Sequence, residues 1–210
     1  MLDQIRVIVL NYKRPENVNK IIKAYHGIFP ITVINNNPDT SFETNLPIDI
    51  INNKENRMCM ERWKRCYEFP EPFKFVLDDD LIVSPKSIAR MRRARQHIVG
   101  IYGKSGVKTA SSYLGLKDHW CENYECDFLV GSGILVRQES LDVIKDELDT
   151  WGYPERGDDI IVSYLMKKHL GAWRRTIKAD VISLPEGDVG LNKDPSHFTK
   201  RWEVLQECLN

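Results

Sequence analysis

The chain of 210 residues is long enough for one domain with a substantial hydrophobic core. Its 30 Lys and Arg residues balance 30 Asp and Glu residues, and this net charge of zero argues against general binding to nucleic acid or to an anionic membrane. Five cysteines without a CxxC pair argue against a disulfide framework and a structural zinc site, and predict reduced thiols in a cytoplasmic protein. No apolar stretch reaches about 18 residues, so we expect no membrane span.

Short apolar runs alternate with amphipathic segments in the first part of the chain. The residues after Pro15 place apolar side chains at i, i+3, i+4 and i+7, which predicts a helix that ends near Gly27. Strands are expected at 5–10, 31–34, 48–51 and 73–77, and a second helix at 57–68. This order is typical of an α/β fold with a mostly parallel sheet flanked by helices.

The second half of the chain has a less regular pattern. It predicts a helix over 84–98, two strands separated by a glycine break up to Arg137, and further helices over 138–148, from Asp158 onward and over 196–208. Residues 183–198 are rich in Gly, Pro and Asp, which predicts a mobile loop before the last helix.

The segment "FKFVLDDDLIV" (73–83) ends a buried strand with three adjacent carboxylates, Asp78, Asp79 and Asp80. Open α/β sheets bind ligands at the carboxyl ends of their strands. Alternate strand residues face the same way, so we expect Asp78 and Asp80 to reach one Mg²⁺ or Mn²⁺ ion together, which then bridges a diphosphate. A solvated turn of acids is the alternative, but the apolar residues on both sides favour the metal.

Two other classes of protein also place acidic residues at the end of a strand, namely proteins with a phosphate-binding loop and certain phosphatases, but the sequence fits both poorly. The segment "GIYGKS" (100–105) suggests a phosphate-binding loop, but Ile98 stands where its first glycine is required and the preceding residues are predicted as helix. Phosphatases of the haloacid dehalogenase type carry a DxD sequence after their first strand, whereas the acidic cluster here follows the fourth.

Several motifs in this order resemble the nucleotide-sugar glycosyltransferases of the GT-A fold. The segments "VLNYKRP", "VINNN" and "VLDDDL" carry the resemblance in the first half. "GDDIIVSYLM" and "SHFTKRW" are similar to segments of the exostosin-like transferases, so that the resemblance spans nearly the whole chain. It implies a single GT-A domain, in which 1–83 is the nucleotide-binding half and 84–210 is the acceptor-side half with a C-terminal lid.

The resemblance also implies the reaction. The expected donor is a UDP-sugar of the glucose or rhamnose type, the expected cofactor is Mn²⁺ or Mg²⁺, and the expected acceptor is a hydroxyl group of a glycan on a viral capsid glycoprotein. The sequence lacks the N-terminal membrane anchor of Golgi relatives. We therefore expect a cytoplasmic enzyme or one domain of a longer, multidomain protein.

The resemblance implies donor-binding roles for residues in both halves. Asp78 is expected to accept a ribose hydroxyl, Asp79 to approach the donor sugar and Asp80 to coordinate the metal. The other expected donor contacts are Leu10, Asn11, Tyr12, Arg14, Asn36, Asn37, Arg57, Gly131, Ser132 and His197. Each has a structural alternative: the asparagines suit turn geometry, the glycines around Ser132 suit a β-bulge, and a surface Arg or His needs no ligand.

Asp158 and Asp159 begin a predicted helix, where one is expected to cap the helix and the other to act near the anomeric carbon. We favour Asp159, either as the base of an inverting reaction or as a stabilising charge in a retaining one, and the resemblance favours retention. Arg201 is expected to neutralise the leaving diphosphate. Trp151 and Tyr153 offer aromatic faces for an acceptor sugar, or else anchor their loop.

Two other classes of function remain as alternatives. A non-catalytic nucleotide-sugar or glycan-binding module would keep the metal site and show no turnover. A metal-dependent phosphohydrolase would release phosphate from simple esters without any need for UDP.

Overall fold

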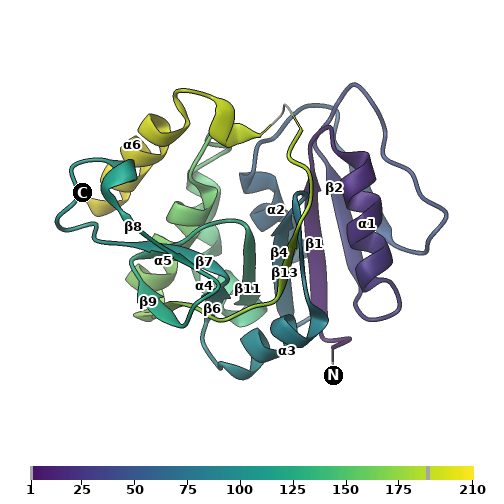
Figure 1. Ribbon diagram of the computed structural model, residues 1–210, viewed down its shortest axis with the longest axis horizontal. Helices are drawn as coiled ribbons and strands as arrows, with labels where there is room; N and C mark the ends of the chain where they lie inside the picture. Colours follow the sequence, from purple (N-terminus) through teal and green to yellow (C-terminus); the bar gives the residue numbers. More distant parts are fainter. Residues whose placement is uncertain (1, 188–189) are drawn as a thin grey trace.

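Over residues 2–187 and 190–210, which the computed structural model describes, a central sheet of eight strands carries helices on both faces (Figure 1). The strand order is β3 (Asp49–Asn52), β2 (Ile31–Asn35), β1 (Ile5–Asn11), β4 (Phe73–Asp78), β11 (Gly133–Arg137), β6 (Ile98–Gly100), β12 (Arg174–Thr176) and β9 (Tyr124–Cys126). The first four strands in this order are parallel, and β11 runs antiparallel to β4. The predicted α/β fold with a mostly parallel sheet is confirmed.

The two faces of β1 supply two separate hydrophobic clusters. Ile8 and Leu10 belong to the cluster that includes side chains of α2, α4, α5 and α6, whereas Val7 and Val9 belong to the cluster with α1 and α3. The helices are α1 (Pro15–Tyr25), α2 (Met60–Arg65), α3 (Pro85–Arg93), α4 (Gln138–Thr150), α5 (Asp158–Leu170) and α6 (His197–Leu209). All of β1 is buried, as expected for a parallel strand that is covered on both sides.

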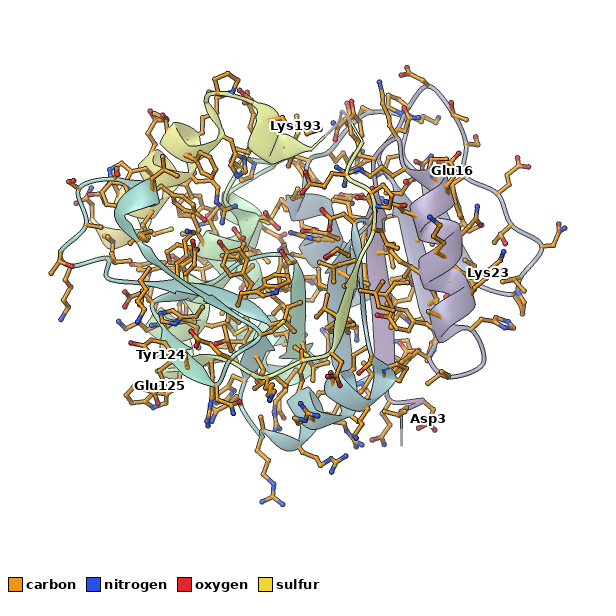
Figure 2. All side chains as sticks on the ribbon, viewed as in Figure 1. Asp3, Glu16, Lys23, Tyr124, Glu125 and Lys193 are labelled. Atoms are coloured by element: carbon orange, nitrogen blue, oxygen red, sulfur yellow. The ribbon has the colours of Figure 1, made fainter. Side chains whose placement is uncertain are left out.

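Helix α1 is amphipathic and packs its apolar side against the sheet. Its apolar residues pack inward, including Val18 and Ile21. Glu16 and Lys23 lie on the outer side of the helix in Figure 2, and both are exposed. The helix therefore buries one stripe and leaves its charges in water, as its sequence period predicts.

Two smaller sheets shape the region beyond the main one. β7 (Tyr102–Ser105) lies between β8 (Lys117–Trp120) and β10 (Phe128–Leu129). β13 (Val181–Ser183) pairs with β5 (Leu81–Val83), the strand that follows the Asp triplet. In Figure 1, α6 and β8 lie on one side of the molecule, and α1 and β2 lie on the other.

The predicted helix over 84–98 is wrong in its second part. Helix α3 begins at Pro85, with the Ser84 side chain accepting a hydrogen bond from the Ser87 backbone, but it ends at Arg93. Arg95 has a φ of 55°, in the left-handed region that cannot continue a helix. Buried Ile98 then begins β6, so the run after the helix is a strand.

The other long segments differ less from expectation. The helix predicted over 57–68 begins at Met60 because Met58 has a φ of 54°, and a 3₁₀ turn over Cys66–Glu68 completes it. The predicted loop over 183–198 contains a 3₁₀ turn at Leu191–Lys193, and its residues 188–189 lie outside the described residues. The division into two functional halves and the lid stay predictions. None of the helices in the described ranges combines the length and apolar character needed to cross a membrane.

Candidate functional site

A cavity of about 640 Å³ opens at the carboxyl ends of β1 and β4. Because β1 and β4 are parallel, with Leu10 paired to Asp78, the turn after β1 lies beside the Asp triplet. The opposite wall comes from the second half of the chain, through the start of α5, the start of α6 and the strands β7 and β8. The predicted site residues that line the cavity are Leu10, Tyr12, Arg14, Asn36, Asp78, Asp79, Asp80, Gly131, Ser132, Asp158, Asp159, His197 and Arg201. The fold thus brings segments far apart in sequence to one space of the size typical for small ligands.

Arg62, on α2, connects the Asp triplet to the start of α5. Its Nε and Nη2 donate to Asp158 Oδ2 at 3.1 and 2.9 Å, and its Nη1 donates to the Asp78 carboxylate. Trp63 Nε1 donates to the same Asp158 oxygen at 2.7 Å. Burial alone would lower the pKa of Arg62, but Asp158 and Asp78 raise it well above its usual value. Arg62 therefore stays charged and holds two carboxylates in place although its side chain is 2% exposed.

Gly131 leaves the space that Arg62 occupies. A Cβ atom at this glycine would lie 2.3 Å from Arg62 Nη2, and the Gly131 carbonyl accepts from Arg62 Nη1 at 3.3 Å. On the other side, the Gly131 N–H donates to Asp159 Oδ2 at 2.7 Å. A glycine at position 131 therefore leaves room for the Arg62 guanidinium group.

We expect Gly131→Ala to destabilise the protein by about 1–3 kcal/mol, because the added methyl group must displace Arg62 from its buried partners. Its φ lies outside the left-handed region, so the effect comes from the contact and not from backbone strain. Gly115→Ala is the matched control, since its new Cβ would meet atoms no nearer than 3.7 Å. Urea unfolding of both variants measures the difference, and equal stabilities would contradict this role of Gly131.

Asp79 faces the turn after β1. Its Oδ2 accepts from the Tyr12 backbone N–H at 2.9 Å, and its Oδ1 accepts from Arg14 Nη1 at 2.6 Å. Burial raises the pKa of Asp79 to about 6, and these two donors oppose the rise. Asp79 is thus engaged by protein groups, and it fixes the position of the turn that carries Tyr12 and Arg14.

Asp80 is the member of the triplet that protein groups leave available. Within residues 2–187 and 190–210 its carboxylate accepts no hydrogen bond, and Arg14 Nη1 lies 3.7 Å from its Oδ2. Burial, together with the charges of Asp78 and Asp79, raises the pKa of Asp80 to about 7. A partly buried carboxylate that is crowded by two others gains most from a cation.

Asp159 forms a paired ion contact with Arg201. Arg201 Nη2 donates to Asp159 Oδ1 and Oδ2 at 2.9 and 2.8 Å, and Arg201 Nε donates to the Tyr113 hydroxyl at 2.8 Å. Burial opposes ionisation of Asp159, but Arg201 outweighs it and holds the pKa of this carboxyl below its usual value. Asp159 therefore carries a negative charge, and Arg201 is its ion-pair partner.

Three side chains that line the cavity each retain a buried nitrogen atom without a partner in the described part of the chain. These atoms are Arg14 Nε, Arg156 Nε and His197 Nδ1. Burial, with Arg201 and Arg156 nearby, lowers the pKa of His197 to about 4, so that its ring is neutral at physiological pH. Unpartnered buried nitrogen atoms are costly, and a ligand rich in oxygen acceptors would satisfy them.

The predicted asparagines mainly stabilise the strand ends. Asn11 Nδ2 donates to Asn35 Oδ1 at 2.8 Å, and Asn11 does not line the cavity. Asn37 Oδ1 accepts from the Asp39 backbone at 3.3 Å in a turn that is also away from the cavity. Asn36 lines the cavity, but its amide already donates to the Met58 carbonyl. Contacts at turns and strand ends engage all three residues, and their donor-binding roles stay predictions.

Arg57, Trp151 and Tyr153 are not brought to the cavity either. Arg57 pairs with exposed Glu55 at 3.3 Å. Trp151 packs against the hydrophobic core, and Tyr153, 42% exposed, lies under the Lys64 ammonium at 4.6 Å from its ring centre. Trp151 thus anchors its loop. Neither aromatic side chain lines the cavity, and their acceptor roles stay predictions.

The cavity also contains residues that the sequence did not single out. They are Arg62, Tyr102, Lys104, Tyr113, Asp118, Trp120 and Arg156, among others. Arg62 lies in a helix whose sequence "ERWKR" shows several charges without indicating which is buried. The strand Lys117–Trp120 has the sequence "KDHW", in which two charged residues precede the imidazole and the indole, so that no alternation indicated its two faces.

The fold and this cavity define a Rossmann-like α/β protein with a polar site at the carboxyl ends of its parallel strands. No protein-family model matches the chain, and no curated protein matches it. Among solved structures, a mannose-1-phosphate geranyltransferase from Thermus thermophilus is similar over 85% of this chain and 76% of its own, with 8% identity and a TM-score of 0.50. This likeness shows the fold alone.

Two other solved structures are similar at lower scores. HddC from Yersinia pseudotuberculosis matches 86% of this chain and 95% of its own, with 11% identity and a TM-score of 0.48. The glycosyltransferase GlyE of Streptococcus pneumoniae matches 96% of this chain and 50% of its own, with 13% identity and a TM-score of 0.44. The resemblance to exostosin-like transferases and the expected viral acceptor stay predictions.

Proposed function

We propose that the protein is a metal-dependent glycosyltransferase that moves a sugar from a UDP-sugar to a hydroxyl group of a glycan acceptor. The observation that carries this proposal is the meeting, in one cavity, of the available Asp80 carboxylate with the unpartnered nitrogens of Arg14, Arg156 and His197. A divalent cation would bind the Asp80 carboxylate, and the oxygen atoms of a diphosphate would accept hydrogen bonds from the unpartnered nitrogens. The glucose or rhamnose type of the donor and the viral capsid acceptor rest on the sequence resemblance.

The charges around the cavity favour a cation as part of the ligand. Seven carboxylates and five Lys or Arg side chains line it among the described residues, so the negative charges are in excess. A bare diphosphate would meet this excess unfavourably, whereas a cation–diphosphate complex would not. No group of three or more His, Cys, Asp or Glu side chains in the described ranges is arranged to enclose a metal. Mg²⁺ and Mn²⁺ fit this pattern, since they often take one or two carboxylates and complete their shell with phosphate oxygens and water.

Asp80 would hold the cation in this proposal. Asp78, although predicted as a second ligand, is engaged by Arg62 and so contributes mainly its charge. The bound cation would supply neutralisation of the charge that develops on the departing diphosphate. Arg14 and Arg156 would hold diphosphate oxygens, and Tyr12, which also lines the cavity, would lie against the uracil ring.

The proposed transfer breaks the bond between the anomeric carbon and the β-phosphate oxygen. The acceptor oxygen bonds to that carbon, and its proton leaves with UDP. Arg201 keeps Asp159 ionised, so Asp159 is poorly suited to act as a base that takes up a proton. It is better suited to act as a fixed negative charge that stabilises positive charge on the sugar. This preference supports the retaining outcome.

Product analysis tests the proposal. Purified protein incubated with UDP-sugars, Mn²⁺ and a mixture of glycosides should release UDP, by transfer or slow hydrolysis, and EDTA should abolish the release. Anion-exchange chromatography separates the outcomes. Pyrophosphate formed from a nucleoside triphosphate and a sugar phosphate would identify a nucleotidyltransferase, and inorganic phosphate from simple esters would identify a phosphohydrolase. Binding of UDP-sugar without any product would identify a non-catalytic module.

A further inference from the structure

The strands β7 and β8 present four side chains to the cavity on one face. Tyr102 pairs with Trp120 and Lys104 pairs with Asp118 in the antiparallel register, and all four line the cavity. Their spacing of two residues along each strand places them on the same side. His119, between Asp118 and Trp120, is 1% exposed and lies on the other side.

This face combines an aromatic surface with an open carboxylate. The rings of Tyr102 and Trp120 meet edge to face, with centres 5.3 Å apart, and Trp120 is 46% exposed. Asp118 Oδ1 accepts from the Lys104 ammonium and the Tyr102 hydroxyl, and Lys104 helps to hold the pKa of Asp118 below its usual value against the effect of burial. Asp118 Oδ2 has no partner among the described residues, and the side chain is 58% exposed.

Contacts on the other side of β8 hold the two strands in position. His119 contacts Ser105 Oγ at 2.7 Å through Nε2 and Glu122 through Nδ1, and its ring stacks on Tyr124 with centres 3.5 Å apart. A side chain whose neighbours are already ordered loses less conformational entropy when a ligand binds. The strand that carries Trp120 is therefore held from its other side, and the Tyr102 ring contacts the exposed indole on this side.

A pyranose ring has the matching chemistry. Its C–H groups form an apolar face that stacks on an aromatic side chain, and its hydroxyl groups donate to a carboxylate. Open-chain polyols carry the same hydroxyls but lack the rigid apolar face. Tyr12, Arg14 and Asp80, to which donor contacts are assigned above, come before residue 84, whereas this face comes from residues 102–120.

We propose that the face formed by Tyr102, Lys104, Asp118 and Trp120 binds a pyranose ring of the acceptor glycan. As an acceptor site it rests on the proposed function, and it replaces Trp151 and Tyr153 in that role. Trp120 would lie against the ring, and Asp118 would accept a hydroxyl hydrogen bond. Both are binding residues, which orient the acceptor for attack.

The indole N–H signals in a ¹H–¹⁵N spectrum test the site. Trp120→Phe assigns the Trp120 signal, and the protein is titrated with the methyl pyranosides of glucose, galactose, mannose, xylose and rhamnose, and with sorbitol. At least one pyranoside should move the Trp120 signal, whereas sorbitol should not. Trp173, 65% exposed and away from the cavity, should stay unchanged and is the matched control.

Variants complete the test. Trp120→Ala and Asp118→Asn should each weaken pyranoside binding roughly tenfold, and Trp173→Ala should have no effect. If no pyranoside moves the Trp120 signal, or if Trp120→Ala binds as the wild type does, the inference is overturned. A parallel titration with UDP and Mg²⁺ separates the two claims. If UDP binds but no pyranoside moves the Trp120 signal, this acceptor site alone is overturned. If a pyranoside moves the Trp120 signal but UDP does not bind, the proposed function is overturned and the face is a glycan-binding site of another kind of protein.

Discussion

Arg62→Met should lower the stability of the protein by about 3–5 kcal/mol, which corresponds to a fall in Tm on the order of 10 °C. Arg62 is buried and donates to both Asp78 and Asp158. Methionine fills a similar volume but leaves these two carboxylates without their cation. Breaking one side of a buried ion pair is costly because the remaining charge is uncompensated. Thermal and urea unfolding of the purified variant measure the loss.

Arg57→Met is the control for this change. Arg57 lies on the same segment of the chain, pairs with Glu55 at the surface and should change the stability by no more than about 0.5 kcal/mol. A double-mutant cycle sharpens the result, since Asp158→Asn should cost less in the Arg62→Met background than in the wild type. If Arg62→Met were as stable as Arg57→Met, the claim that Arg62 connects the triplet to α5 would be wrong.

Asp80→Asn should have two opposite effects. It should raise the stability of the ligand-free protein at pH 8 by about 1–2 kcal/mol, because it removes one of three adjacent negative charges. No hydrogen bond within the described residues offsets the burial of Asp80, and its pKa of about 7 reflects burial and the charges of Asp78 and Asp79. The same change should abolish metal-dependent binding of UDP. Unfolding curves and calorimetric titrations measure the two effects.

A stable protein with impaired ligand binding is the signature of a site that sacrifices stability for function. Asp146→Asn, on the exposed side of α4, is the control and should change neither property. A loss of stability in Asp80→Asn would instead mean that the carboxylate supports the fold and is not held ready for a cation.

The parallel core could be predicted from the sequence because its signals are local. The run over Ile5–Asn11 is apolar at nearly every position, and the amphipathic spacing after Pro15 matches α1. The polar residues after β1 and β4 had to meet at one edge once those strands were parallel. These arguments need no knowledge of distant contacts.

The second half depends on contacts that a local pattern does not contain. Strands of two to four residues, such as Phe128–Leu129 and Lys117–Trp120, are too short to show a clear period. The left-handed φ of Arg95 ends α3 without a glycine or proline to indicate it. The sequence therefore singled out Trp151 and Tyr153, whereas the aromatic side chains that line the cavity include Tyr102 and Trp120.

The sequence also did not distinguish between two arginines of one segment. Arg57 and Arg62 are five positions apart, and tertiary contacts with both β4 and α5 place Arg62 between Asp78 and Asp158. A sequence shows which residues are charged, but the partner of a buried charge is set by tertiary structure.

The most direct test of the account is the effect of UDP on the Tm of the wild type and of Asp80→Asn, each measured with Mn²⁺ and with EDTA. With UDP at about 100 times its Kd, the wild type should gain about 2.7 kcal/mol of stability, or a rise in Tm of about 5–10 °C, when Mn²⁺ is present. EDTA or the Asp80→Asn change should remove that gain, and ADP and GDP should produce a smaller one. A wild type that does not respond to UDP, or one that responds equally with EDTA, would contradict the claim that Asp80 binds a cation–diphosphate complex.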